Sequence, residues 1–297
     1  MAAHYWLAYC EKFQRDRDRL ADCRKRVNVM PLGVAALAGT SLPIDRQETA
    51  RLLGFDSVAA NSLDVSSDRD FLAEAIFSMS LIAVHLSGWA EEWILWCTTE
   101  FGFLKLPDAY TTGSSIMPQK RNPDVLELIR GKSARVIADV QQILTLVKGL
   151  PMAYNRDLQE DKEPLFDAVD TCRLALTALD GLLASARFEE GAMAAAADHP
   201  LNAATDLAEH LVAGGTPFRE AHAIVGSLVR RSLDEGISLA DLVVEEPRLG
   251  PDCVGLLGPG RAVLRRTTPG GGGPDPVAEQ LDRARACLAS EREWLDR

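Results

Sequence analysis

Residues 72–97 form the most apolar segment of this 297-residue chain and limit the folds that it can adopt. The segment is interrupted by four residues that can carry charge: Glu74, His85, Glu91 and Glu92. With these interruptions it is a poor membrane span, whereas a helix that is apolar on nearly every face is normally surrounded by other helices. We therefore expect a buried helix, either in a large bundle or at a subunit interface. Ser67 and Asp70 predict a capping box at its start.

Three further segments show helical periodicity. Apolar residues recur at steps of three, four and seven within residues 6–27. Asn122 and Pro123 supply an N-cap and a first-turn proline for a helix that ends near Gly149. A fourth helix begins at Pro164. Long helices joined by loops rather than strands predict an all-α fold built as a long-helix bundle.

The pattern of the chain changes after about residue 190, where the predicted helices shorten and glycine and proline become frequent. We therefore expect two domains. Residues 1–190 form a central helical-bundle domain, and residues 191–297 form a small helical C-terminal domain that ends with a helix over residues 277–294.

Composition excludes several classes of function. The formal net charge of -11 argues against a nucleic-acid surface, which needs a surplus of Lys and Arg. The six cysteines are scattered without the spacing of a metal site, so we expect no metal and reduced thiols. No signal peptide is visible at the N-terminus, and we expect a cytoplasmic protein that does not bind membranes.

A glycine- and serine-rich segment, residues 112–124, leads into the N-terminus of the predicted third helix. Backbone N–H groups and the helix dipole favour an anion at such a place, and Lys120 adds a full positive charge. Asn122 can cap the helix or bind a carboxylate. The segment suits a reaction in which negative charge develops on a substrate carboxylate. By themselves, these residues are also compatible with an ordinary surface loop.

A second polar segment, residues 154–163, precedes the fourth helix. Its charged side chains, taken alone, describe a solvated loop. The two segments together carry a family resemblance. Residues 113–123 resemble the signature Gly-Ser-Ser-x-Met-Pro-x-Lys-x-Asn-Pro of the fumarase/aspartase superfamily at all eight fixed positions. Residues 154–163 resemble the corresponding loop of the argininosuccinate lyase family and disfavour adenylosuccinate lyase, which shares the serine segment.

The resemblance implies a fold, a reaction and a set of site residues. Argininosuccinate lyases split argininosuccinate into arginine and fumarate by β-elimination, without a cofactor, as homotetramers whose active sites draw on three chains. By this resemblance, the catalytic residues are Ser114, which acts in a mobile loop, and Glu127, which orients a histidine. The implied substrate-binding residues are Lys120, Asn122, Tyr154, Gln159 and Lys162.

The chain also departs from the family pattern. Members of the family carry an N-terminal domain with a Thr-His motif that supplies the catalytic histidine, and this sequence does not contain it. The five histidines lie in other contexts and are expected to be core or surface residues: His4, His85, His199, His210 and His222. Two hypotheses therefore stand: an N-terminally truncated lyase, active alone or with a separate chain, or an inactive or repurposed helical oligomer.

Overall fold

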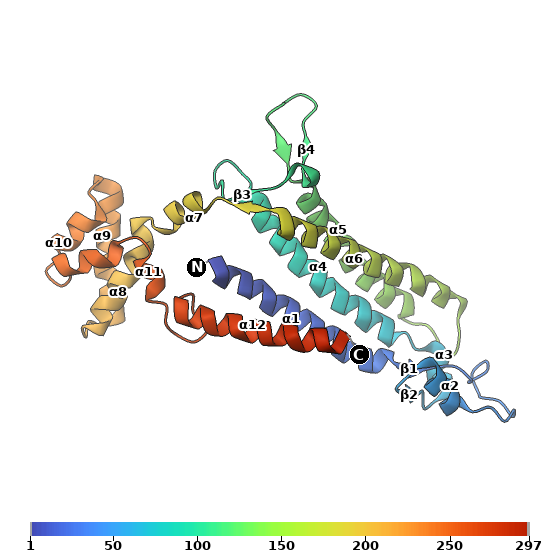
Figure 1. Cartoon of the computed structure of the whole chain (residues 1–297). Helices are drawn as coiled ribbons and strands as arrows, with labels where there is room; N and C mark the ends of the chain where they lie inside the picture. Colours follow the sequence, from blue (N-terminus) through green and yellow to red (C-terminus); the bar gives the residue numbers. More distant parts are fainter. Residues whose placement is uncertain (1, 296–297) are drawn as a thin grey trace. The chain divides into compact units, whose positions relative to one another are not determined.

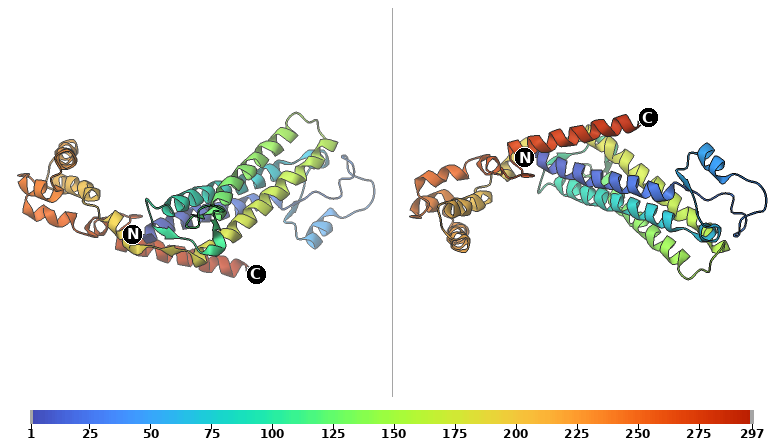
Figure 2. Two further views of the ribbon diagram at one scale, coloured as in Figure 1. Left: turned by 90° about the horizontal axis from the view of Figure 1, so that it is seen from above. Right: turned by 90° about the horizontal axis from the view of Figure 1, so that it is seen from below.

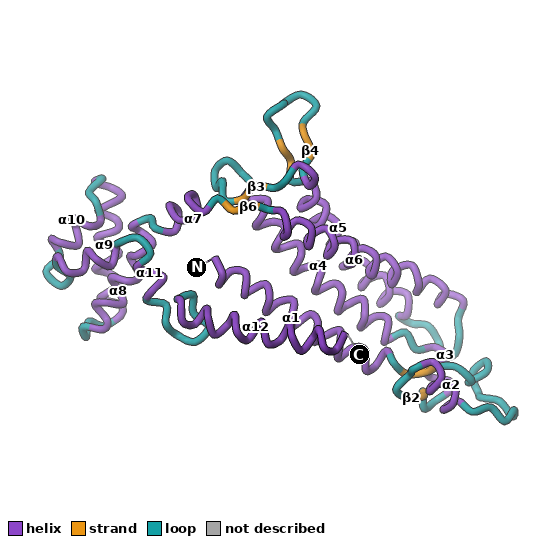
Figure 3. Tube along the Cα trace, viewed as in Figure 1, coloured by secondary structure: helices purple, strands orange, loops and turns teal. Residues whose placement is uncertain are grey.

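The computed structural model describes residues 2–295, and helices dominate it (Figures 1 and 3). The prediction of an all-α fold is confirmed. The chain forms two compact units, one made of Glu11–Phe188 and the other of Met1–Cys10 with Glu189–Arg297. The division expected at residue 190 stays a prediction. The first ten residues, which the sequence assigns to the bundle domain, are grouped with the C-terminal part.

Three long helices form the unit Glu11–Phe188 and lie side by side in Figures 1 and 2: α4 (Asp70–Trp96), α5 (Asp124–Val147) and α6 (Lys162–Ser185). The later part of α1 (Ala2–Val27) joins them, because His85 of α4 contacts Asp16 of α1, with 2.7 Å between Nδ1 and Oδ2. The 24 residues of α5 give it a length of about 36 Å.

Helical spacing explains why these helices pack together. The buried residues of α5 recur every three or four positions and form one face: Leu126, Ile129, Ser133, Val136, Asp139 and Ile143. Val136 and Ile143 are fully buried and share a hydrophobic core with Ile76 of α4 and Ala168 of α6. The burial of these side chains is the main favourable contribution to the bundle.

Helix α4 is less covered than its composition predicts. Ile76, Leu86 and Trp93 are buried, but Phe77 and Val84 are 50% and 46% exposed. Among the described residues, α4 is also the one helix that is long and apolar enough to cross a membrane, a criterion that the core helices of soluble proteins also meet. Its packing against α5 and α6 is that of a core helix.

Short elements close the end of the bundle where α1 ends and α4 begins. They are β1 (Val29–Met30), which pairs in parallel with β2 (Ser57–Val58), together with α2 (Arg46–Leu53) and α3 (Ser62–Ser67). The capping box predicted at Ser67 is not formed. Ser67 donates to the carbonyl of Asp64 at 3.0 Å, and the N–H of Asp70 is bound instead by the Asp68 carboxylate at 2.8 Å.

The predicted starts of the next two helices were wrong by one or two residues. Helix α5 begins at Asp124, since Asn122 lies in a strand and Pro123 occupies the cap position without a side-chain hydrogen bond. Helix α6 begins at Lys162 rather than Pro164, because the 3-10 helix η2 (Arg156–Asp161) runs directly into it.

The unit that contains Glu189–Arg297 consists of shorter helices. In order, they are α7 (Glu190–Ala197), η3 (Pro200–Ala203), α8 (Ala204–Ala213), α9 (Phe218–Glu235), α10 (Leu239–Glu245), η4 (Pro251–Leu257), α11 (Arg261–Leu264) and α12 (Pro274–Leu295). A separate hydrophobic core joins α8, α9 and α10. The fully buried Asp206 carboxylate of α8 accepts hydrogen bonds from Arg265 at 3.0 Å and Arg266 at 2.9 Å.

Candidate active site

The serine segment is a β-hairpin, not the irregular loop that the sequence predicts. Strand β4 (Thr112–Gly113) pairs antiparallel with β5 (Arg121–Asn122), so that Thr112 lies opposite Asn122. Figure 3 shows the hairpin as two short strands and a long loop next to the start of α5. Gly113 and Asn122 are poor strand formers, which explains why the composition of the segment does not predict a ladder here.

Ser114 begins the tip of the hairpin, and its hydroxyl oxygen is held by two donors. The backbone N–H groups of Ile116 and Met117 donate to Ser114 Oγ at 3.2 Å and 3.1 Å. Donors aimed at an oxygen stabilise negative charge on it. A serine is a poor base in water, so this local arrangement supplies one of the two conditions that a catalytic serine requires; the other is a closed, dry site.

The other three residues predicted for this part of the site lie close to Ser114 along the chain. Lys120 is exposed at the end of the tip, and its N–H donates to the carbonyl of Met117 at 3.0 Å. Asn122 is half-buried in β5, and Glu127 is exposed in the first turn of α5. Lys120 adds a positive charge near the N-terminus of this 24-residue helix, whose first turn also carries the carboxylates of Asp124 and Glu127.

Tyr154, Gln159 and Lys162 lie at the opposite end of α5. They follow its last residue and precede or begin α6, so the length of α5, about 36 Å, separates them from the hairpin. Tyr154 is 53% exposed, and Gln159 is exposed as well. One chain therefore does not bring the two predicted groups together around a single small molecule.

An ion-pair cluster that the sequence did not reveal organises this second group. The Asp161 carboxylate is almost fully buried and accepts from Arg69 at 2.5 Å and from Lys162 at 2.7 Å. The contact joins the start of α4 to the start of α6, across 92 positions in sequence. The sequence shows an acidic residue, Asp161, next to Lys162, but it does not show that Asp161 pairs with Arg69. Lys162 is thus held by its neighbour while its side chain stays 61% exposed.

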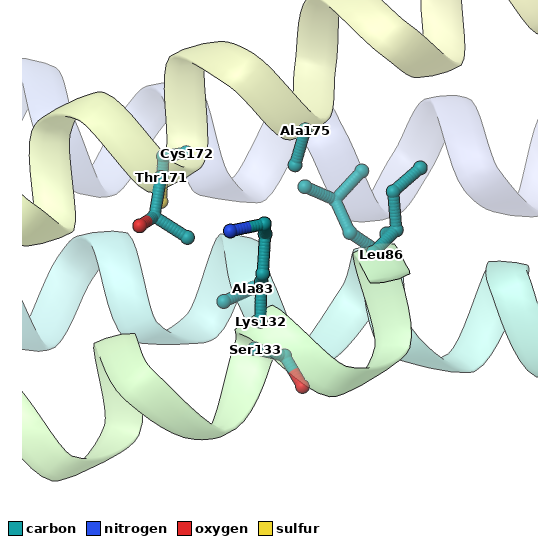
Figure 4. Close-up of a pocket in the computed structure, with 8 residues that line it drawn as sticks. Ala83, Leu86, Lys132, Ser133, Thr171, Cys172 and Ala175 are labelled. Atoms are coloured by element: carbon teal, nitrogen blue, oxygen red, sulfur yellow. The ribbon is translucent and has the colours of Figure 1, made fainter. Parts of the chain in front are cut away.

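Two cavities accompany these groups. A cavity of about 400 Å³ lies at the base of the hairpin, and its lining residues include Cys97, Leu104, Lys105, Asp108, Thr111 and Arg121. A second cavity of about 10 Å³ lies among α4, α5 and α6, where Figure 4 shows Lys132 and Cys172 among the lining side chains. The second has room for about one water molecule and is too small for a substrate.

The described histidines have their own contacts. His85 faces the buried Asp16, which also accepts from Arg19 at 2.8 Å. His4 lies 3.0 Å from the carbonyl of Gly270, and His199 accepts from the N–H of Leu201. His85 therefore pairs with Asp16 of α1 and not with Glu127 of α5. Within residues 2–295, no group of three or more histidine, cysteine or acidic side chains is placed to hold a metal ion.

Comparisons with known proteins extend this picture. Residues 2–138 match the protein-family model described as Lyase, and residues 202–263 match the model described as Argininosuccinate lyase C-terminal. The argininosuccinate lyase of Moorella thermoacetica is 53% identical over 300 residues, covering 99% of this chain and 65% of that protein. The argininosuccinate lyase of Rhodopirellula baltica is 52% identical over 95% of this chain and 62% of that protein.

Solved structures agree on the fold. EDDS lyase in complex with formate superposes with a TM-score of 0.88 at 31% identity, covering 99% of this chain and 61% of that one. A 3-carboxy-cis,cis-muconate lactonizing enzyme from Pseudomonas putida has a TM-score of 0.74 at 20% identity, covers 95% of this chain and 63% of that one, and shows the fold alone.

The chain therefore belongs to the lyase family of long-helix bundle proteins. Within that family, it is a homologue of the argininosuccinate lyases over nearly its whole length. It spans 65% and 62% of the length of the two relatives named above.

Proposed function

We propose that the chain forms the larger part of an argininosuccinate lyase, which splits argininosuccinate into arginine and fumarate. The observation that carries the proposal is Ser114 Oγ, which accepts from two backbone N–H groups in the hairpin that leads into α5. Support also comes from 53% identity to one argininosuccinate lyase across 99% of this chain. That identity favours an enzyme over the inactive or repurposed oligomer.

In the proposed reaction, Ser114 reacts as its alkoxide, stabilised by the two N–H donors, and Oγ takes a proton from the substrate carbon next to a carboxylate. The electron pair of the broken C–H bond moves onto that carboxylate, where Lys120 and the N-terminus of α5 stabilise the added charge. The pair then returns to form the double bond of fumarate while the bond to the guanidinium nitrogen breaks. An acid gives that nitrogen a proton. Glu127 orients a histidine that takes part in the proton transfers. This histidine comes from the Thr-His motif in the N-terminal domain that family members carry, and not from the sequence of this chain.

The proposed active site is shared between copies of the chain. Lys120 and Lys162 lie at opposite ends of a helix of about 36 Å, so each site combines the hairpin of one copy with the Tyr154–Lys162 region of another. Apolar side chains exposed along the long helices would be covered in such an assembly: Phe77, Val84, Leu128, Ile137, Leu144, Phe166 and Leu174. We assign the assembly as a homotetramer.

The proposal includes no cofactor, and its partner is the small-molecule substrate rather than nucleic acid or a membrane. The proposed location is the cytoplasm. All six cysteines lie within the described residues and form no disulfide there, which supports a reducing compartment, and the formal net charge of -11 argues against a nucleic-acid partner.

Release of fumarate, followed by absorbance, tests the proposed function. Because the chain spans 65% of the length of a relative, the assay uses the chain alone and the chain mixed with a polypeptide that covers the remainder. We expect fumarate release in at least one of these samples, and its loss in Ser114→Ala but not in the neighbouring control Ser115→Ala. Absence of release from both samples, or full release by Ser114→Ala, would contradict the proposal.

A further inference from the structure

The hairpin that carries Ser114 is too short to hold itself. Each of its strands has two residues, and the ladder pairs only Thr112 with Asn122 and Gly113 with Arg121. An isolated two-stranded ribbon is marginally stable even when it is longer. The conformation of the tip, residues 114–120, therefore depends on contacts outside the ladder.

Two side-chain contacts supply that support, and each joins one strand to the element that adjoins the other strand. Thr112 of β4 donates its hydroxyl hydrogen to the carboxylate of Asp124, the first residue of α5, which follows β5. Arg121 of β5 forms an ion pair with Asp108 of the 3-10 helix η1 (Asp108–Tyr110), which precedes β4. Each strand is thus attached to the element next to the other strand. The two arms cannot separate at the base unless both contacts break.

The surroundings offer little packing that could replace these contacts. The cavity of about 400 Å³ lies at the base, lined by Thr111, Arg121 and Pro123 among others. A Cβ atom placed on Gly113 would meet no heavy atom within 4 Å. Since close packing is what normally holds a backbone in place, the side-chain contacts set the position of the hairpin base.

The two contacts differ in strength. The side chains of Arg121 and Asp108 are 60% and 80% exposed, and ion pairs that exposed contribute little. Asp124 is half-buried at the N-terminus of α5, where a negative charge is favoured. A hydroxyl bound to such a carboxylate makes a charge-assisted hydrogen bond, which is the stronger kind. The Thr112–Asp124 contact is therefore the main support of the hairpin.

We propose that Thr112 and Asp124 are positioning residues that clasp the hairpin base and so hold Ser114 and Lys120 in place, with Asp108 and Arg121 as a weaker second clasp. The consequence for catalysis rests on the proposed function of Ser114. The effect on the conformation of the hairpin does not.

Hydrogen exchange tests the clasp directly, because the amides of Ile116 and Met117 are the donors to Ser114 Oγ. We expect about tenfold faster exchange at these amides in Thr112→Val, since a hydrogen bond to a charged group is lost. Asp108→Asn should accelerate exchange about twofold, as expected for an exposed pair. Thr112→Ser keeps the hydroxyl and should exchange at the wild-type rate.

Limited trypsin digestion at Lys120 and Arg121 should follow the same order, while the urea midpoint of Thr112→Val stays at the wild-type value because the hairpin opens locally and leaves the helices folded. Unchanged exchange in Thr112→Val, or equal acceleration in Thr112→Ser, would overturn the clasp. Exchange is measured on the full chain and needs no turnover.

A second readout links the clasp to catalysis. In the fumarate assay, kcat/KM of Thr112→Val should fall about tenfold and Thr112→Ser should restore it, because a hairpin base that is no longer held displaces Ser114 from its productive position. A wild-type kcat/KM in Thr112→Val would show that the clasp does not position Ser114. If the wild-type protein releases no fumarate, the proposed function fails, while the exchange order still decides whether the clasp exists.

Discussion

Asp139 places a carboxyl group on the buried face of α5, in the hydrophobic core of the bundle. It lies on the buried face of α5 between Val136 and Ile143 and is 7% exposed. Its Oδ2 atom has no hydrogen-bond partner among the described residues. Burial raises the pKa of Asp139 from 3.8 to about 6, and the negative charge of Asp167 adds to the effect while Arg135 opposes it.

The raised pKa sets the size and the sign of a mutational effect. A shift from 3.8 to about 6 makes the ionised carboxylate about 3 kcal/mol less favourable in the folded than in the unfolded chain. The folded state holds the proton more tightly, so the penalty is absent below pH 3.8, grows as the unfolded chain ionises, and is complete above pH 6. Asp139→Asn removes the ionisation while keeping the shape.

We therefore predict that Asp139→Asn raises the free energy of unfolding by about 3 kcal/mol at pH 8 and by much less near pH 4. Urea unfolding across this range, at one protein concentration, measures the difference. Asp170→Asn, an exposed position on α6, serves as the control for a changed surface charge. No gain at pH 8, or a gain of the same size at both pH values, would refute the reasoning.

Further predictions concern packing, ion pairing and thiol reactivity. Ile143 is fully buried, so Ile143→Ala should lower the free energy of unfolding, measured in urea, by about 2–5 kcal/mol. Ile137→Ala, at a position that is 47% exposed, should change it far less in the monomer. Equal effects of the two variants would contradict the packing. Asp206→Asn should destabilise the C-terminal unit by about 2 kcal/mol, seen as a lower midpoint in calorimetry, because two arginines lose their buried partner; an unchanged midpoint would contradict it. Burial raises the pKa of Cys172 to about 11, so its thiol stays protonated and unreactive at pH 8. Mass spectrometry after alkylation at pH 8 should find the exposed Cys10 labelled well before Cys172. The reverse order would contradict the burial of Cys172.

The long helices could be predicted because their apolar residues recur with the period of a helix. The end of α2 could be predicted as well, since Gly54 follows its last residue and adopts a φ of 78°, which favours glycine. Such signals are local, and each depends on residues a few positions apart.

Contacts between distant residues could not be predicted in this way. The Arg69–Asp161 pair joins residues 92 positions apart. The hairpin around Ser114 was missed because two-residue strands leave no alternating pattern. The sequence predicts Asn122 as a helix cap, but Asn122 pairs opposite Thr112 in the ladder, and α5 begins at Asp124.

The candidate site residues came from a family resemblance, and the sequence alone did not show their arrangement. The structure places Ser114 before and Tyr154 after α5, a helix about 36 Å long. This separation turns the expectation of shared active sites into a geometric requirement of the proposed function.

A mixing experiment tests that requirement most directly. Ser114→Ala and Gln159→Ala are each prepared as full chains, assembled with the polypeptide that covers the rest of the relatives' length where activity needs it, and assayed for fumarate release separately and after joint refolding. Each variant alone should be nearly inactive. If sites combine the hairpin of one copy with the Tyr154–Lys162 region of another, the mixture should regain part of the wild-type activity. Activity in the mixture that does not exceed the sum of the two variants would contradict a shared site.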